Sequence, residues 1–186
     1  MNRLLCLLVI ITFFIRVQAQ VKPTYRSFNT VGITIGNSKS AYQVLTTHGV
    51  SYKSWYAGVG TGVDDYRNRS VPVILSVSRY LLPQNNLFIN VNAGPNFVWG
   101  ESERNRLWNQ LDSKAFPGLF AEAGFGFRLE TKNPEQGIIF GTYYSYKNFK
   151  ERFEVPGVCN NPPCDNMNEY IKSRFSRWAF KLGFVF

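Results

Sequence analysis

Few side chains in this sequence have the types and spacing that catalysis requires. The chain contains one histidine, His48, which follows Thr47 and precedes Gly49. A hydrolase of the Ser-His-Asp kind needs a histidine that acts as general base beside a nucleophile. We interpret Thr47, His48 and Gly49 as a tight turn, so His48 is expected to be a turn residue. We therefore predict no catalytic site, and a lipid-modifying enzyme that uses His48 is the less favoured alternative.

Two cysteines near the C-terminus have a spacing that favours a disulfide. Cys159 and Cys164 enclose the sequence Asn-Asn-Pro-Pro, while the third cysteine, Cys6, belongs to the apolar N-terminal segment. A redox motif needs tighter spacing at a helix N-terminus, and a zinc site needs more ligands. In an exported protein, an even pair of this kind indicates a structural bond. We expect a Cys159–Cys164 disulfide, no metal site and no cofactor.

Four charged residues lie on the polar faces of two segments with alternating hydrophobicity. Glu122 and Arg128 fall in residues 116–130, and Arg177 and Lys181 fall in residues 172–186. Glycine is frequent on the same faces, whereas the opposite faces are apolar, as the period of a β-strand allows. We interpret the charges as a network inside a barrel. The opposite faces are interpreted as lipid-facing, with Phe125, Phe127, Phe180, Leu182 and Phe184 as their representatives.

The elements that position these residues are strands, because period-two alternation recurs along the chain and no long helical period does. Connections between them alternate between tight turns, as at residues 47–49, 83–86 and 132–135, and longer loops, as at 100–115 and 150–171. The pattern predicts an all-β fold, an eight-stranded antiparallel up-and-down transmembrane β-barrel after a cleaved signal peptide. The eight strands are expected at residues 28–36, 41–47, 52–63, 70–81, 87–99, 116–130, 137–149 and 172–186.

The distribution of charge distinguishes a membrane barrel from a soluble one. A lipocalin-like barrel hides its apolar face inside, whereas a membrane barrel turns that face towards lipid. A charge on the lipid-facing side costs about 2–4 kcal/mol near the midplane, so Glu122, Arg128, Arg177 and Lys181 favour an interior position. Aromatic residues also concentrate near strand ends, as interface girdles would, at Tyr52, Trp55, Tyr80, Trp99, Phe116, Tyr146, Phe149, Trp178 and Phe186. A soluble ligand-binding barrel is the alternative.

The N-terminus and the overall charge indicate an exported, membrane-associated protein. A short basic start, an apolar run from Leu4 to Ile15 and the sequence Val17-Gln18-Ala19 have the layout of a signal peptide. We therefore assign residues 1–19 to a signal peptide and residues 20–186 to the barrel domain. The net charge is +9, but the basic residues are scattered and form no stripe for nucleic acid. Attraction to anionic lipid headgroups is the better explanation of that charge.

Several motifs resemble those of a known group of proteins. The strand Tyr56–Asp64, the sequence Val71-Pro72-Val73, Asn92-Ala93-Gly94, the strand Glu122–Arg128 and the terminal Phe186 are similar to small outer-membrane β-barrel proteins of the Bacteroidetes type. The resemblance covers residues 25–186 and implies a bacterial outer-membrane location. It also implies that the barrel-assembly machinery reads the C-terminal aromatic residue during insertion.

The expected function follows from the small size of the barrel. Eight strands enclose an interior that their own side chains fill, so we expect no open pore. A structural or interaction role is expected instead, with outer-membrane lipids around the wall. An unidentified protein partner would bind through the loops at residues 100–115 and 150–171, since loops carry most recognition surfaces.

Overall fold

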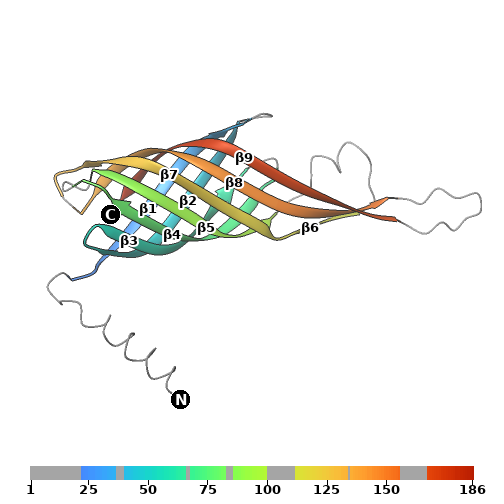
Figure 1. Cartoon of the computed structure of the whole chain (residues 1–186), viewed down its shortest axis with the longest axis horizontal. Coiled ribbons are helices and arrows are strands. Elements are labelled where there is room, and N and C mark those ends of the chain that lie inside the picture. Colours follow the sequence, from blue (N-terminus) through green and yellow to red (C-terminus); the bar gives the residue numbers. More distant parts are fainter. Residues whose placement is uncertain are drawn as a thin grey trace, which may run out of the picture.

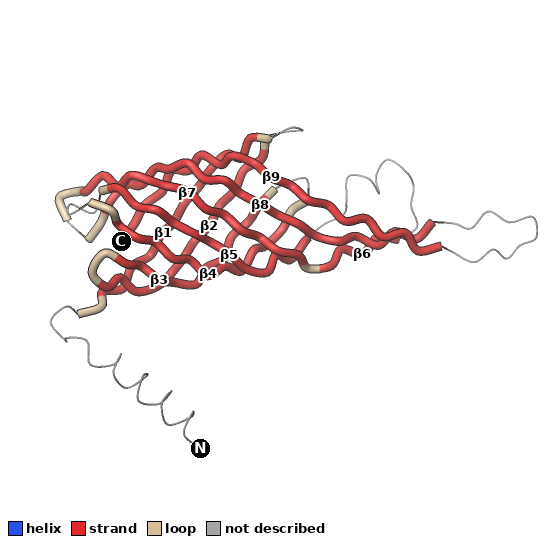
Figure 2. Tube along the Cα trace, viewed as in Figure 1, coloured by secondary structure: helices blue, strands red, loops and turns tan. Residues whose placement is uncertain are grey.

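The computed structural model describes residues 22–36, 40–65, 68–82, 86–99, 112–133, 135–155 and 167–186. These residues form one closed antiparallel sheet (Figures 1 and 2). Its strands are β1 (Thr24–Ile35), β2 (Ala41–Tyr52), β3 (Trp55–Asp64), β4 (Ser70–Tyr80), β5 (Leu87–Val98), β6 (Asp112–Phe116), β7 (Gly118–Glu130), β8 (Gly137–Val155) and β9 (Met167–Val185). Within the described ranges, no helix is long and apolar enough to cross a membrane.

The nine strands of the described residues occupy eight positions in the wall of the barrel, and we call each position a stave. Strands β6 and β7 are two parts of one stave. Both pair with β8, and only Pro117 separates them. Proline has no N–H group to donate to a neighbouring strand, so the ladder breaks at this residue. Each stave pairs with the next along the chain, and β9 closes the barrel by pairing with β1 from Phe28–Val185 to Ile35–Trp178. This confirms the predicted all-β, eight-stranded antiparallel up-and-down fold.

The register determines how wide the barrel is. A path of paired residues that leaves β1 at Thr24 and goes once around the barrel returns to β1 at Thr34. This stagger is roughly 33 Å along the strands, and eight strands measure about 38 Å across, so the strands tilt by about 41°. The backbone cylinder then has a radius of about 8 Å, which is room for the side chains of its own wall.

The predicted turn at residues 47–49 is wrong. Strand β2 runs to Tyr52, the hairpin turns at Lys53 and Ser54, and His48 lies inside the strand. Gly49 marks a close approach between strands, because a Cβ there would overlap the backbone around Ala57 on β3. Lys53 is the residue that the tight turn constrains, since its φ of 54° lies in the left-handed region.

The strands at the end opposite to the C-terminus are longer than expected. Strand β8 continues to Val155 and β9 begins at Met167, so much of the predicted loop at 150–171 is a hairpin. Figure 1 shows β8 and β9 running beyond the other strands at that end, with β6 beside them. We call residues 112–116, 149–155 and 167–175 the extension. The short turns and the C-terminus lie at the other end, the turn end of the barrel (Figure 1).

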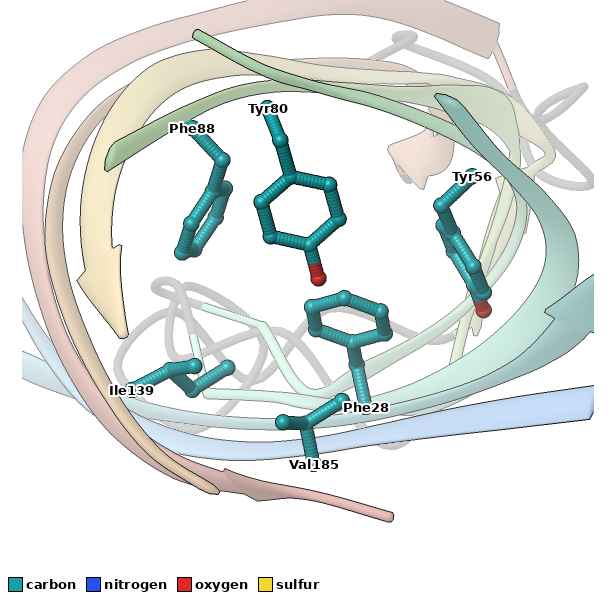
Figure 3. Close-up of a cluster of buried hydrophobic side chains, with 6 residues drawn as sticks. All are labelled: Phe28, Tyr56, Tyr80, Phe88, Ile139 and Val185. Atoms are coloured by element: carbon teal, nitrogen blue, oxygen red, sulfur yellow. The ribbon is translucent and has the colours of Figure 1, made fainter. Parts of the chain in front are cut away.

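An apolar layer lies inside the barrel near the turn end, and Figure 3 shows how its side chains meet. The Phe28 and Tyr56 rings lie 4.6 Å apart between centroids, and the Tyr80 and Phe88 rings lie 5.8 Å apart. Two of the residues predicted for interface girdles, Tyr80 and Phe149, point inward instead, with 4% and 3% exposure. The layer consists of Phe28, Tyr56, Tyr80, Phe88, Ile139 and Val185.

Replacing Lys53 with glycine is expected to stabilise the barrel. A left-handed conformation costs a non-glycine residue about 1–2 kcal/mol, and the greater freedom of glycine when unfolded offsets part of that gain. We expect Lys53→Gly to raise the free energy of unfolding by about 0.5–1 kcal/mol in urea titrations of the protein in lipid vesicles.

Lys53→Ala is the control, because it keeps the strained φ and removes the side chain beyond Cβ, including the ammonium group that lies 5.5 Å from the centroid of the Tyr52 ring. A stabilisation by alanine equal to that by glycine would contradict the strain explanation.

Candidate functional site

The middle of the barrel interior holds a buried ion pair between β7 and β9. The Lys181 ammonium donates to Glu122 Oε1, and the two side chains are 4% and 0% exposed. Asn92 on β5, which faces Glu122 in the register, donates its amide to the same carboxylate oxygen over 3.1 Å. The ammonium also lies 4.9 Å from the centroid of the Tyr143 ring. A buried charge pair persists only with such additional partners, because both ions have lost their water.

Glycines in the wall make room for these interior side chains. A Cβ on Gly32 would lie 2.7 Å from Cγ of Lys181, and a Cβ on Gly126 would lie 2.5 Å from the edge of the Phe88 ring. The lysine stem and the phenyl ring therefore occupy the space that side chains at these two positions would fill. What remains beside the ion pair is a cavity of about 20 Å³, bordered by Glu122, Lys181 and Asn92. That volume is enough for about one water molecule.

A second polar cluster lies towards the extension. Lys147 on β8 donates to the backbone oxygen of Asn68 over 3.0 Å, and its ammonium lies 3.8 Å from Asp64 Oδ2. The Asn68 amide donates to Glu151 Oε1 over 2.8 Å. All four side chains are buried, so the β3–β4 connection is held against β8 over the interior.

Cations close the interior at the turn end. Arg128 is 1% exposed and donates to the backbone oxygen of Gln136 over 3.3 Å, and its guanidinium lies 3.9 Å from Glu130. Arg26 donates to the Tyr80 hydroxyl over 3.2 Å, directly beside the apolar layer.

The structure buries all four charged residues that the sequence analysis assigned to the interior, but it does not gather them at one level. Glu122 and Lys181 are paired directly. Arg177 shares a register row with Glu122, and Ser145 of β8 lies between them. Arg128 lies at the turn end, beside the 131–136 turn. The single network expected from the sequence is thus divided along the barrel axis.

The outer wall carries the apolar side chains. Phe125, Phe180 and Leu182 are 59%, 50% and 57% exposed, and Phe184 also faces outward. Phe127 is half-buried, since its ring packs 5.6 Å from that of Phe140 between centroids. All of these residues except Phe184 border an open apolar groove of about 630 Å³ that crosses β1, β9, β8 and β7 on the outside of the barrel.

His48 is part of a polar chain on the outer wall. Its Nδ1 lies 2.7 Å from the Tyr25 hydroxyl, and its Nε2 lies 3.2 Å from the Thr46 hydroxyl. Thr46 in turn donates to Asn29 over 2.7 Å. Both ring nitrogens thus face hydroxyl groups of residues in strands, and no hydrogen bond within the described residues joins His48 to a carboxylate. The arrangement lacks the orienting carboxylate of a Ser-His-Asp site.

Other expected sites can be placed only in part. No cluster of three or more metal-ligating side chains occurs in the part of the chain that the structure describes. Cys159 and Cys164 lie outside the described residues, as does most of the loop at 100–115.

Sequence comparisons find no match, whereas structure comparisons find proteins of similar structure. No protein-family model matches the chain, and no curated protein matches it. The outer membrane protein OprG from Pseudomonas aeruginosa has a similar structure, with a TM-score of 0.52, 13% identity and coverage of 88% of this chain and 94% of that chain. The outer membrane protein AlkL, solved in DMPC lipid bilayers, aligns with a TM-score of 0.40, 14% identity and coverage of 87% and 89%. The likeness to OprG shows the fold of a small outer-membrane β-barrel.

Removing one partner of the central ion pair is expected to destabilise the barrel strongly. Lys181→Met leaves the Glu122 carboxylate buried without its cation, which costs about 3–5 kcal/mol. In the double variant Glu122→Gln, Lys181→Met no charge remains, so we expect the free energy of unfolding to recover by at least about 2 kcal/mol relative to Lys181→Met alone.

Urea titrations in vesicles measure both values, and Glu122→Gln alone completes the cycle. If the effects of the two single substitutions simply add in the double variant, the two side chains are not coupled and the assignment of the pair is wrong.

Proposed function

We propose that this chain is a bacterial outer-membrane protein that spans the bilayer as a barrel closed to solutes and acts through the surface of its extension. One observation carries the proposal: the sidedness of the sheet is opposite to that of a soluble barrel. Phe125 and Leu182 face outward, while Glu122 and Lys181 are buried inside. That arrangement is favourable where hydrocarbon surrounds the wall and unfavourable in water.

The height of the apolar wall supports a membrane location. On β7, the outward-facing positions run from Leu119 to Leu129, and both of these leucines are exposed. Ten residues of strand at the tilt given above rise by about 25 Å, which matches the apolar band of outer-membrane barrels. Exposed tryptophans lie near its borders, at Trp55 on the turn side and at Trp99 and Trp178 on the side of the extension. Aromatic girdles of this kind sit at membrane interfaces.

The interior cavity is too small to favour the alternative of a soluble ligand-binding barrel. A site for a small molecule usually occupies about 300–1,000 Å³. The interior cavity beside Glu122 and Lys181 measures about 20 Å³, so it is too small for a ligand of that size. The large groove is on the outer wall, where a soluble carrier would expose it to water.

The interior of the barrel is proposed to be closed to solutes. The apolar layer, the Glu122–Lys181 pair and the Asp64–Lys147 cluster fill successive levels of the interior. Because side chains from different strands pack or pair at each level, opening a path requires several buried contacts to break together. We therefore propose a structural or interaction role rather than passage of solutes, and we propose that the protein is not an enzyme.

The route to the membrane is part of the same proposal. Residues 1–19 act as the signal peptide, and the assembly machinery reads Phe186, as the resemblance to Bacteroidetes-type barrels implies. The structure of the seam is compatible with that role, since Phe186 and Ser27 exchange two backbone hydrogen bonds of 2.7 and 3.1 Å. Partner proteins are proposed to bind at the loops of residues 100–115 and 150–171.

Planar-bilayer recordings test whether the barrel is closed. We expect the wild-type protein to give no conductance steps, because the interior levels leave no continuous path. A variant that truncates side chains at all three levels, Phe28→Ala, Phe88→Ala, Glu122→Ala, Lys181→Ala, Asp64→Ala and Lys147→Ala, is expected to conduct ions.

Phe180→Ala, on the outer wall, is the matched control and should remain silent. Resistance to alkaline extraction from vesicles establishes insertion for every variant. Regular steps from inserted wild-type protein would contradict the closed lumen, and wild-type protein that alkali extracts completely would contradict membrane residence.

A further inference from the structure

The outer face of the extension is strongly basic. Alternation continues along β8 and β9 beyond the apolar wall, but the outward positions there carry cations. The register brings Lys150 opposite Lys172, Arg174 opposite Asn148, and Lys114 opposite Arg152. Lys172 and Arg174 are exposed, and Lys150 is half-buried. Cations on three adjacent strands therefore share one surface.

A pocket of about 280 Å³ opens among these cations, where the break at Pro117 interrupts the stave. The register pairs Lys150–Lys172 and Asn148–Arg174, which are separated by one pair, line the pocket together with Gly118. Gly118 is needed there, because a Cβ would overlap the backbone oxygen of Asn148. The shape of the pocket therefore depends on the close approach of two backbones as well as on long side chains.

Asn148 is held in place by its neighbours. Its Oδ1 accepts a hydrogen bond from the Leu119 N–H over 2.9 Å, and its Nδ2 donates to the Tyr146 hydroxyl over 3.2 Å. The backbone of β7 and the wall of β8 are thereby fixed relative to each other immediately beside the pocket. This link joins β7 to β8 two residues beyond the break at Pro117, on the border of the pocket.

The three pocket cations lack acidic partners among the described residues. The salt bridges of this part of the chain do not include Lys150, Lys172 or Arg174. The Lys150 ammonium lies 4.2 Å from the centroid of the Tyr170 ring, which orients it without neutralising it. The nearby Arg152 differs, since Glu154 lies 3.4 Å from it. Like charges on neighbouring strands repel, so the pocket favours an anion.

The position of the pocket along the barrel axis indicates which anion it binds. The Tyr144 and Trp178 rings pack edge to face, 5.4 Å apart between centroids, at the border of the apolar wall. Arg174 lies four residues beyond Trp178 on β9, which is roughly 13 Å along the strand and about 10 Å along the barrel axis. In a membrane that spans the apolar wall, this is the level of the headgroups of the leaflet on the side of the extension.

We infer that the pocket binds a phosphate group of an outer-leaflet lipid headgroup, because the short connections of outer-membrane barrels face the periplasm and here they lie at the opposite end, the turn end. Arg174 offers a guanidinium fork that matches two phosphate oxygens, and Lys150 and Lys172 add point charges from the facing row. The acyl chains of the lipid lie against the apolar wall below the pocket. The inference rests on the proposed membrane location, and it adds a ligand class to that location.

The test compares two triple variants of the full chain that carry the same change of charge. Lys150→Gln, Lys172→Gln, Arg174→Gln removes the pocket cations. Lys53→Gln, Arg79→Gln, Lys132→Gln removes three exposed cations at the turn end. Each protein is reconstituted in phosphatidylcholine nanodiscs and titrated with bis-phosphorylated lipid A, and native mass spectrometry measures the bound fraction. We expect the pocket variant to bind about tenfold more weakly or worse, and the turn-end variant to bind like wild type.

Two further titrations test whether the ligand is a phosphate group carried by a lipid. Lipid A without phosphates should bind wild type as weakly as the intact lipid binds the pocket variant, and inorganic phosphate at equal concentration should not displace the intact lipid. Equal binding by both triple variants, or displacement by free phosphate, overturns the inference. Insertion into the discs is scored separately. Protein that inserts without this preference leaves the membrane proposal standing, whereas protein that does not insert refutes the membrane proposal itself.

Discussion

The closure of eight staggered strands into a narrow cylinder is the constraint on which the rest of this structure depends. A strand sends alternate side chains to opposite faces, so closure assigns every residue of the wall either to the interior or to the outside. With a radius of about 8 Å, the interior accepts only side chains that fit together and pair. This explains why Glu122 pairs with Lys181 over the inner face of β8 and why Gly32 lies beside the lysine stem.

The interior of the barrel contains both polar and apolar layers. Bonded charges lie at the middle level and towards the extension, while Phe28, Tyr56 and Phe88 form an apolar layer near the turn end. Such layers stabilise the barrel in different ways. The apolar layer gains from burial in any surroundings, whereas the ion pairs depend on their geometry, because desolvation cancels much of their attraction. The two kinds of layer together also leave little free volume in the lumen.

Alternation in the sequence predicts the eight staves and the sidedness of Phe125 and Lys181, but not β6 or the continuation of β8 and β9 into the extension. Alternation does not predict the structure where one residue type serves two structural roles. The sequence favours a turn at Gly49, whereas this glycine allows two strands to approach closely, and the sequence favours girdle positions for Tyr80 and Phe149, whose side chains point inward. The pairing of Glu122 with Lys181 in place of Arg128 depends on the register across β8, which composition and spacing do not contain. The basic pocket likewise needs the break at Pro117 and three strands side by side.

The claim that supports all others is that hydrocarbon touches one face of each strand and not the other. Nuclear Overhauser effects between lipid acyl chains and methyl groups of the wild-type protein in nanodiscs measure this directly. The account predicts strong effects at Leu75 and Leu182, which are 66% and 57% exposed, and none at Leu45 and Ile74, which are 3% and 1% exposed. Acyl-chain contacts at Leu45 and Ile74, with water contacts at Leu75 and Leu182, would contradict it.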